Sequence, residues 1–420
     1  MNRIRPLPLV LPLLLAGTSA AQEPSLVELR RGFDTELSQK VRDDDGWGDP
    51  DSELFSKVDY RGPAGRLSAW LSGAPEGADP ASKHPVMLWV TGGFPAGGAG
   101  SSAWLPSDQD NDQSAKIYRE SGMVMMYPSF RGSFGNDGYQ EGFLGEVDDL
   151  LAAIDYVKTV SYVDPKQVFV GGHSTGGTMA LLAAASTNEL RGVISLGPVA
   201  DPFDYGEDTV LHKLGREGER SLRAPIRHLE RIQVPTIVIE GENGNAPSLR
   251  AMRDATANAS IQFIEVPGTD HFELIASVNR VLAKKLTRLG KRDSVRVSAD
   301  DVTEALLSQR VELRKAELLS EVSRRLRVGL GVDDKIFAEW RFYGQDRAAV
   351  DEAVAELTKA GFLARPTEVV EDDDGTWFIV DIRKRVAPSN FKAMFKAARE
   401  FTEAQTAHRL VYGGWEFLES

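Results

Sequence analysis

The chain has 420 residues, a net charge of −13 and no cysteine. This length exceeds one ordinary core, so two domains are expected, and 42% apolar with 26% charged residues is a globular composition. The acidic balance argues against nucleic acid as a partner, because phosphate binding needs a basic face. The lack of cysteine excludes a thiol nucleophile, disulfides and cysteine-ligated metals.

The first 21 residues are typical of a secretory signal peptide. Arg3 and Arg5 precede an apolar run from Leu7 to Leu15, and small residues up to Ala21 suit signal peptidase. The run is short for a bilayer span, and no later stretch is apolar for long enough, so stable membrane insertion is not expected. An uncleaved anchor is the alternative. The expected localisation is periplasmic or secreted.

Residues 22–290 are expected to form one α/β domain. An alternating pattern predicts an opening β-hairpin within residues 55–71. Apolar runs predict buried strands at 85–90, 123–127, 167–171, 192–196, 235–240 and 261–266, with a helix at 147–157. Strands that alternate with helices imply a mostly parallel sheet covered on both faces. The polar insertion at 203–232 could form a lid over the site.

Gly172-His173-Ser174-Thr175-Gly176 is a G-x-S-x-G motif between a β-branched apolar run and an alanine- and leucine-rich helix pattern. Strand, sharp turn and helix in this order form a nucleophile elbow, which presents a serine at the carboxyl edge of a sheet. Ser174 is therefore the predicted nucleophile, and His173 is expected to be structural. An idle serine in a glycine-rich turn is the alternative.

A glycine-rich loop, Thr91 to Gly98, follows the strand predicted at 85–90. In a hydrolase with a nucleophile elbow, this loop and the residue after the serine supply the two backbone N–H groups of the oxyanion hole. Gly93 and Thr175 are assigned these roles. A flexible connector or a phosphate cradle is the alternative, but the Walker lysine and a spaced G-x-G-x-x-G are both missing.

Asp270-His271-Phe272 follows the last predicted strand of this domain. That position lies at the sheet edge where Ser174 emerges, and the order serine then histidine is the one such a fold requires. His271 is the predicted general base. A surface histidine before a helix is the alternative.

The acid of the triad is ambiguous. It is expected after the strand at 235–240, but Gly244 stands where the aspartate usually lies. Glu242 is the first candidate in that loop, and Asp201, after the preceding strand, is the second. Two further carboxylates remain as weaker alternatives, Glu240 and Asp270.

These motifs resemble the α/β-hydrolase domain of the prolyl oligopeptidase family and its dienelactone-hydrolase-like relatives. The resemblance covers residues 55–289 and rests on Thr91-Gly92-Gly93, Arg131-Gly132-Ser133, Gly145-Glu146-Val147-Asp148-Asp149, the elbow, and Asp270-His271-Phe272. It implies an α/β-hydrolase fold and a serine hydrolase that needs no metal or organic cofactor. Its substrate would be a small ester or peptide.

Ester and peptide hydrolysis both remain open. Family peptidases often carry tyrosine after the serine, whereas Thr175 also suits esterases, so a carboxylic ester is slightly favoured over a peptide bond. The alternatives are a serine peptidase of the prolyl oligopeptidase type and a non-catalytic binding protein on a hydrolase fold.

The remaining chain is predicted to hold a helical linker at 291–332 and an α+β domain at 333–420. Ser298 to Asp301 resembles a capping box that starts a long charged helix, which reads as a spacer. The order βαββαβ beyond it is ferredoxin-like. Tyr343, Glu371 to Trp377 and Tyr412 to Phe417 resemble the regulator of ribonuclease E activity, type B. That resemblance implies a binding role toward an unknown protein partner.

Overall fold

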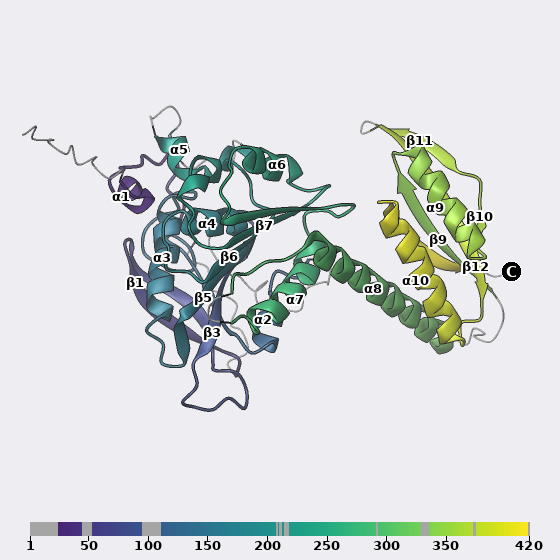
Figure 1. The fold of residues 1–420 in the computed structure, drawn as a ribbon, viewed down its shortest axis with the longest axis horizontal. Helices are drawn as coiled ribbons and strands as arrows, with labels where there is room; N and C mark the ends of the chain where they lie inside the picture. The colour runs from purple at the N-terminus through teal and green to yellow at the C-terminus, as the bar shows by residue number, and fades with distance from the viewer. Residues whose placement is uncertain are drawn as a thin grey trace, which may run out of the picture.

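The structure is a computed structural model that describes residues 24–43, 53–94, 111–206, 209, 212–213, 218–290, 293–328, 336–372 and 375–418. The predicted signal peptide at 1–21 lies outside the described residues. Across these ranges, no helix has both the length and the apolar character needed to cross a membrane. Two separate sheets are joined by one long helix (Figure 1).

The first sheet has eight strands in the order β1-β2-β4-β3-β5-β6-β7-β8. An antiparallel hairpin, β1 with β2, pairs antiparallel with β4, and all later pairs are parallel. This is the predicted α/β-hydrolase fold. The strands are β1 Phe55–Gly62, β2 Gly65–Ser72, β3 His84–Val90, β4 Val124–Pro128, β5 Val163–His173, β6 Gly192–Leu196, β7 Thr236–Gly241 and β8 Ile261–Val266.

Helices cover both faces of this sheet, as the buried parallel strands require. One core cluster joins α1, α3, α4 and α6 to the sheet, and a second joins α2, α7 and the first part of α8. The helices are α1 Leu26–Arg31, α2 Ile117–Glu120, α3 Gly145–Val157, α4 Thr175–Ala184, α6 Ala246–Asp254, α7 Leu274–Leu286 and α8 Ala299–Arg327. The described part of the predicted lid holds α5 Glu219–Arg223 and 3-10 turns, η2 Pro202–Tyr205, η4 Pro225–Arg227 and η5 Leu229–Arg231.

The second sheet is antiparallel, with the order β10-β12-β9-β13 and with β11 also paired to β12. Two helices pack on it to form its core, giving the expected βαββαβ order. The second strand of that order is split into β10 and β11. The elements are β9 Ile336–Gly344, α9 Arg347–Lys359, β10 Leu363–Ala364, β11 Glu368–Asp372, β12 Gly375–Val386, α10 Phe391–Ala407 and β13 Val411–Leu418. We call this part, with its connections, the C-terminal domain.

Helix α8 joins the two sheets but is more than a spacer. Val302 and Leu306 belong to the second core cluster of the first sheet, while Leu318 and Val322 belong to the core of the C-terminal domain. Buried positions recur every four residues along one side, at 302, 306, 310, 314, 318 and 322. The two middle positions are arginines, and this is why the sequence of the helix reads as a solvated, charged segment.

Candidate active site

The elbow after β5 holds Ser174 in the strained conformation that the motif predicts, with φ 54° and ψ −118°. Its glycines are required by close backbone approach. A Cβ on Gly176 would lie 2.0 Å from the carbonyl oxygen of Val90, and one on Gly172 would lie 2.5 Å from the carbonyl of Gly176. Only glycine fits at these positions, so the serine is held at the carboxyl edge of the sheet, at the start of α4.

The loop after β3 approaches the elbow at Gly93, which has a φ of 110°. The hydroxyl of Thr175 donates to the carbonyl oxygen of Gly93 at 2.9 Å, which ties the loop to the first turn of α4. Within the described ranges, neither the Gly93 N–H nor the Thr175 N–H donates to another residue. Thr175 lies at the start of α4, the positive end of the helix. The rest of the glycine-rich loop, 95–98, lies outside the described residues.

His271 contacts the carboxylate of Glu240, which lies near the end of β7. The distance from His271 Nδ1 to Glu240 Oε2 is 2.9 Å, and the glutamate side chain is fully buried. Backbone N–H groups of Gly241 and Asn245 also donate to this carboxylate, at 2.6 and 2.9 Å. Since a carboxylate oxygen accepts hydrogen bonds, Nδ1–H is assigned as the donor of this contact, and Nε2 is the ring nitrogen that does not contact Glu240.

The two acids favoured by the sequence do not contact His271. Glu242 accepts from the N–H of Gly268 at 2.9 Å and from Arg409 at 3.4 Å. Asp201 caps η2 through the N–H of Phe203 and pairs with Arg220. Asp270 caps the start of the following turn through the N–H groups of residues 272 and 273. The predictions of Glu242 and Asp201 as partners of the histidine are therefore wrong in their geometry.

The glycine at the usual aspartate position explains why Glu240 takes this place. A Cβ on Gly244 would lie 2.5 Å from Glu240 Oε1 and 3.0 Å from the Cα of His271. The longer glutamate side chain reaches from the strand end into the space that an aspartate at 244 would fill. A strand-end glutamate combined with glycine at that position is the sequence signal that could have identified this acid.

His173 fixes the backbone of the histidine turn. Its ring lies 4.5 Å from that of His271, and its Nε2 donates to the carbonyl oxygen of His271 at 2.9 Å. Burial, followed by the nearby His271, lowers the pKa of His173 to about 3, so the ring is neutral at pH 7. Its expected structural role agrees with these contacts.

Gln113 is a residue of the site that lies in no sequence motif and was not predicted. Its amide NH₂ donates to Nδ1 of His173 at 2.9 Å, and its carbonyl accepts from the N–H of Gly92 at 3.1 Å. Gly92 precedes the expected oxyanion donor Gly93. Gln113 and His173 therefore connect the loop after β3, at Gly92, to the turn that carries His271.

Tyr205, at the end of η2, forms an aromatic wall beside the elbow. Its hydroxyl lies 2.9 Å from Oγ1 of Thr178, and its ring stacks on Phe143 with centroids 5.8 Å apart. The ring of Phe94 meets it edge-on at 5.1 Å. Burial raises the pKa of Tyr205, while hydrogen bonds with Thr178 and Ser174 oppose this shift. The phenol is therefore neutral and lies next to the predicted nucleophile.

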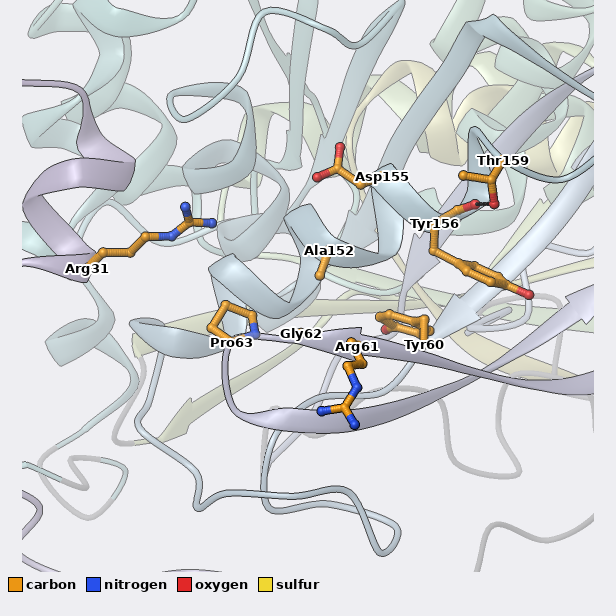
Figure 2. A pocket seen from close by; sticks show the side chains of 9 residues that line it. All are labelled: Arg31, Tyr60, Arg61, Gly62, Pro63, Ala152, Asp155, Tyr156 and Thr159. Atoms are coloured by element: carbon orange, nitrogen blue, oxygen red, sulfur yellow. Dashed lines mark hydrogen bonds between the residues drawn. The ribbon is translucent and has the colours of Figure 1, made fainter.

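A surface pocket of about 470 Å³ lies elsewhere, between β1 and α3 (Figure 2). None of the site residues above lines it, so it is separate from the candidate active site. Its lining residues are Arg31, Tyr60, Arg61, Gly62, Pro63, Ala152, Asp155, Tyr156 and Thr159. Among the described residues, no group of three or more histidine or carboxylate side chains could hold a metal ion.

Residues 109–249 match the model of the prolyl oligopeptidase family. The matched segment contains Ser174, Glu240 and the elbow, and it ends before His271. The match therefore includes the predicted nucleophile and Glu240, while His271 lies beyond it and contacts Glu240 in the structure of this chain.

The similar proteins include peptidases and a quorum-quenching protein. The quorum-quenching protein AidA of Acinetobacter baumannii (strain MDR-ZJ06) is 35% identical over 81 residues, which are 19% of this chain and 27% of that protein. A puromycin-hydrolyzing peptidase of Mycobacterium tuberculosis has 18% identity and a TM-score of 0.47, covering 58% of this chain and 41% of its own. An acylaminoacyl peptidase has 14% identity and a TM-score of 0.46, covering 59% and 44%. The chain thus spans about a quarter of AidA and less than half of these peptidases.

Proposed function

We propose that this protein is a serine hydrolase that cleaves a carboxylic ester or a peptide bond through an acyl-enzyme, with the ester slightly favoured. The buried Glu240 carboxylate, 2.9 Å from Nδ1 of His271, carries the proposal. This pair and the strained Ser174 come from the ends of β7, β8 and β5, which lie at one edge of the sheet. The three side chains supply the nucleophile, the base and the acid of a triad.

In the proposed reaction, Ser174 Oγ attacks the carbonyl carbon while His271 Nε2 accepts the hydroxyl proton. The N–H groups of Gly93 and Thr175 bind the oxyanion, and one such donor typically contributes about 3 kcal/mol to the barrier reduction. Protonated His271 then gives its proton to the leaving alkoxide or amine, and Glu240 stabilises the imidazolium. Water, deprotonated by His271, attacks the acyl carbon and releases the acid and Ser174.

Two observations bear on the substrate. The residue after Ser174 is Thr175, where family peptidases often carry a tyrosine. Its hydroxyl donates to the carbonyl oxygen of Gly93. The ring of Phe94 is 46% exposed and packs edge-on against Tyr205, so it offers an apolar surface near the elbow for one part of the substrate. Together they favour an ester with an apolar group over a peptide.

A site without an acid would favour a non-catalytic binding protein. Glu240 supplies the carboxylate that the sequence lacked at its usual position, and its burial against His271 favours the enzyme. A serine peptidase of the prolyl oligopeptidase type remains the alternative substrate class, because the family match includes the elbow.

Fluorophosphonate labelling of the purified full chain tests the proposal. Wild type should be labelled, and Ser174→Ala and His271→Ala should lose the label while keeping the wild-type melting temperature. A panel of p-nitrophenyl esters and peptide p-nitroanilides then separates the two substrate classes. Absence of labelling in folded wild-type protein would overturn the hydrolase proposal.

A further inference from the structure

The turn that carries His271, residues 267–273 between β8 and α7, is held from outside the hydrolase fold. A side chain from the middle of α8 donates to it, and the backbone at Arg409, in the connection between α10 and β13, packs against Gly268. Figure 1 shows α8 running from the hydrolase sheet to the C-terminal domain, whose α10 packs along it. We call residues 267–273 the histidine turn.

Arg310 of α8 binds both ends of the histidine turn. Its guanidinium donates to the carbonyl oxygen of Gly268 at 2.6 Å, and to both carboxylate oxygens of Glu273 at 2.6 and 2.7 Å. Gly268 lies three residues before His271, and Glu273 lies two residues after it. The same guanidinium donates to the hydroxyl of Thr406 in α10 at 3.1 Å, so one side chain joins the turn to the C-terminal domain.

A second contact comes from Arg409, the residue that follows α10 by two positions. Its guanidinium lies 3.4 Å from Glu242, whose other oxygen accepts from the N–H of Gly268. A Cβ on Gly268 would lie 3.2 Å from the Cα of Arg409, so the backbone of the C-terminal domain packs directly on the turn. Glu242 therefore links the two domains instead of orienting the imidazole.

The burial of Arg310 indicates a specific role. Arg310 is 4% exposed. On the same side of α8, the residues one and two turns before it are apolar: Leu306 and Val302. A buried guanidinium is costly unless its donors are paired, and replacement by an apolar residue is often tolerated for stability alone. Here three of its nitrogens are used on Glu273, Gly268 and Thr406. A bidentate, planar group fixes geometry that a point charge would not.

We propose that Arg310 is a positioning residue for His271, and that docking of the C-terminal domain through Thr406 and Arg409 completes the active site. The inference rests on the proposed function. The imidazole must lie within tenths of an ångström of its productive position, and a misplacement of about 1 Å can cost about 100-fold in rate. The turn receives Glu240 and His173 from the hydrolase side, and Arg310 fixes its opposite side. The C-terminal domain therefore sets the catalytic rate.

The first test compares Arg310→Met with Arg314→Met in the full chain. Arg314 is buried on the same side of α8, one turn further on, but it pairs with Glu317 and lies over Tyr412, away from the histidine turn. With the best ester from the panel, R310M should lower kcat about 30-fold with KM within about 2-fold, because the turn moves while the binding surface remains. R314M should keep kcat within about 2-fold even where it lowers the melting temperature.

The second test changes a residue of the C-terminal domain, in the wild-type and in the R310M background. Thr406→Val removes the hydroxyl that accepts from Arg310 and leaves every hydrolase residue in place. We expect a fall in kcat of about 3-fold in the wild-type background, and less than about 1.5-fold in the R310M background, because both changes act through one contact. Valine has nearly the same shape as threonine, so T406V should fold like the wild type. The effect of T406V in the wild-type background therefore tests the contact even if R310M is partly unstable.

The outcomes separate this inference from the proposed function. Loss of all labelling in wild type would overturn the hydrolase itself. Labelled wild type with R310M as active as R314M would overturn the positioning role. Additive effects of T406V and R310M would overturn the transmission from the C-terminal domain through Arg310.

Discussion

The turns that carry Ser174 and His271 differ in what holds them. The serine turn is held by its immediate neighbours: β5, α4, and glycines that pack against the end of β3. The histidine turn is held by residues from β5, β7, α8 and the C-terminal domain. One half of the candidate site is therefore a local structure, and the other half depends on the assembly of the whole chain.

The difference predicts how each half fails. A Cβ added at Gly172 or Gly176 of the serine turn should damage the fold, because backbone atoms of the sheet and of the turn fill the space around these glycines. A change to a side chain that holds the histidine turn, such as Arg310, should lower the rate before it lowers the stability, because these side chains orient one imidazole.

The largest expected effect comes from Glu240→Gln. The amide cannot hold the Nδ1–H tautomer as a carboxylate does, so kcat should fall about 10⁴-fold with the fold intact. Glu242→Gln provides the matched comparison, since it weakens only the contact with Arg409, and kcat should fall less than about 10-fold. Steady-state ester hydrolysis measures both. An E242Q enzyme more impaired than E240Q would restore the acid expected from the sequence.

Two glycine substitutions compare the turns directly. Gly176→Ala would place a Cβ 2.0 Å from the oxygen of Val90, and we expect a loss of at least about 3 kcal/mol of unfolding free energy. Gly268→Ala, at a φ of 63°, should cost about 1 to 2 kcal/mol. Urea unfolding gives both values. Equal stability losses would contradict the contrast between a backbone-filled turn and a side-chain-held turn.

His173 should make folding depend on pH. Its pKa is about 3 in the folded chain and near 6.5 when unfolded, so the unfolded chain binds this proton first as the pH falls. The stability contributed is fully present above pH 6.5 and is lost between pH 6.5 and 3, at about 1.4 kcal/mol per pH unit. Urea unfolding at a series of pH values should give a flatter curve for His173→Gln. Parallel curves for the two proteins would argue against this role.

The smallest expected effect concerns Gly244. Gly244→Ala places a methyl group 2.5 Å from Glu240 Oε1, which can shift, so kcat should fall about 10-fold with little change in stability. In a Glu240→Ala background the methyl group meets no carboxylate and only its 3.0 Å approach to the Cα of His271 remains, so adding Gly244→Ala should lower kcat by about 3-fold or less. The pair tests whether glycine is required there because of Glu240.

The sequence was sufficient for the fold and for the elbow. Strand periodicity placed β3 to β8 within a few residues, because buried strands need apolar runs whatever their partners. The glycines around Ser174 identified the turn, because its strain is local and leaves a pattern within five residues.

The acid and the support of the histidine turn were not predictable in the same way. Glu240, Glu242 and Asp201 are all carboxylates near strand ends, and only the three-dimensional path of each side chain distinguishes them. Gln113 and Arg310 have no motif, since each contacts residues that lie more than 20 positions away in the sequence. The buried side of α8 was not predicted either, because two of its buried positions are arginines, Arg310 and Arg314.

Helix α8 has a consequence for how the chain unfolds. Its first turns lie in one hydrophobic core and its later turns in the other, with Arg310 between them. Unfolding of either core would remove apolar contacts from α8, which also contributes side chains to the other core. Calorimetry should therefore record one cooperative transition for both sheets, and a protease that cuts α8 should inactivate the enzyme and lower its melting temperature in the same step.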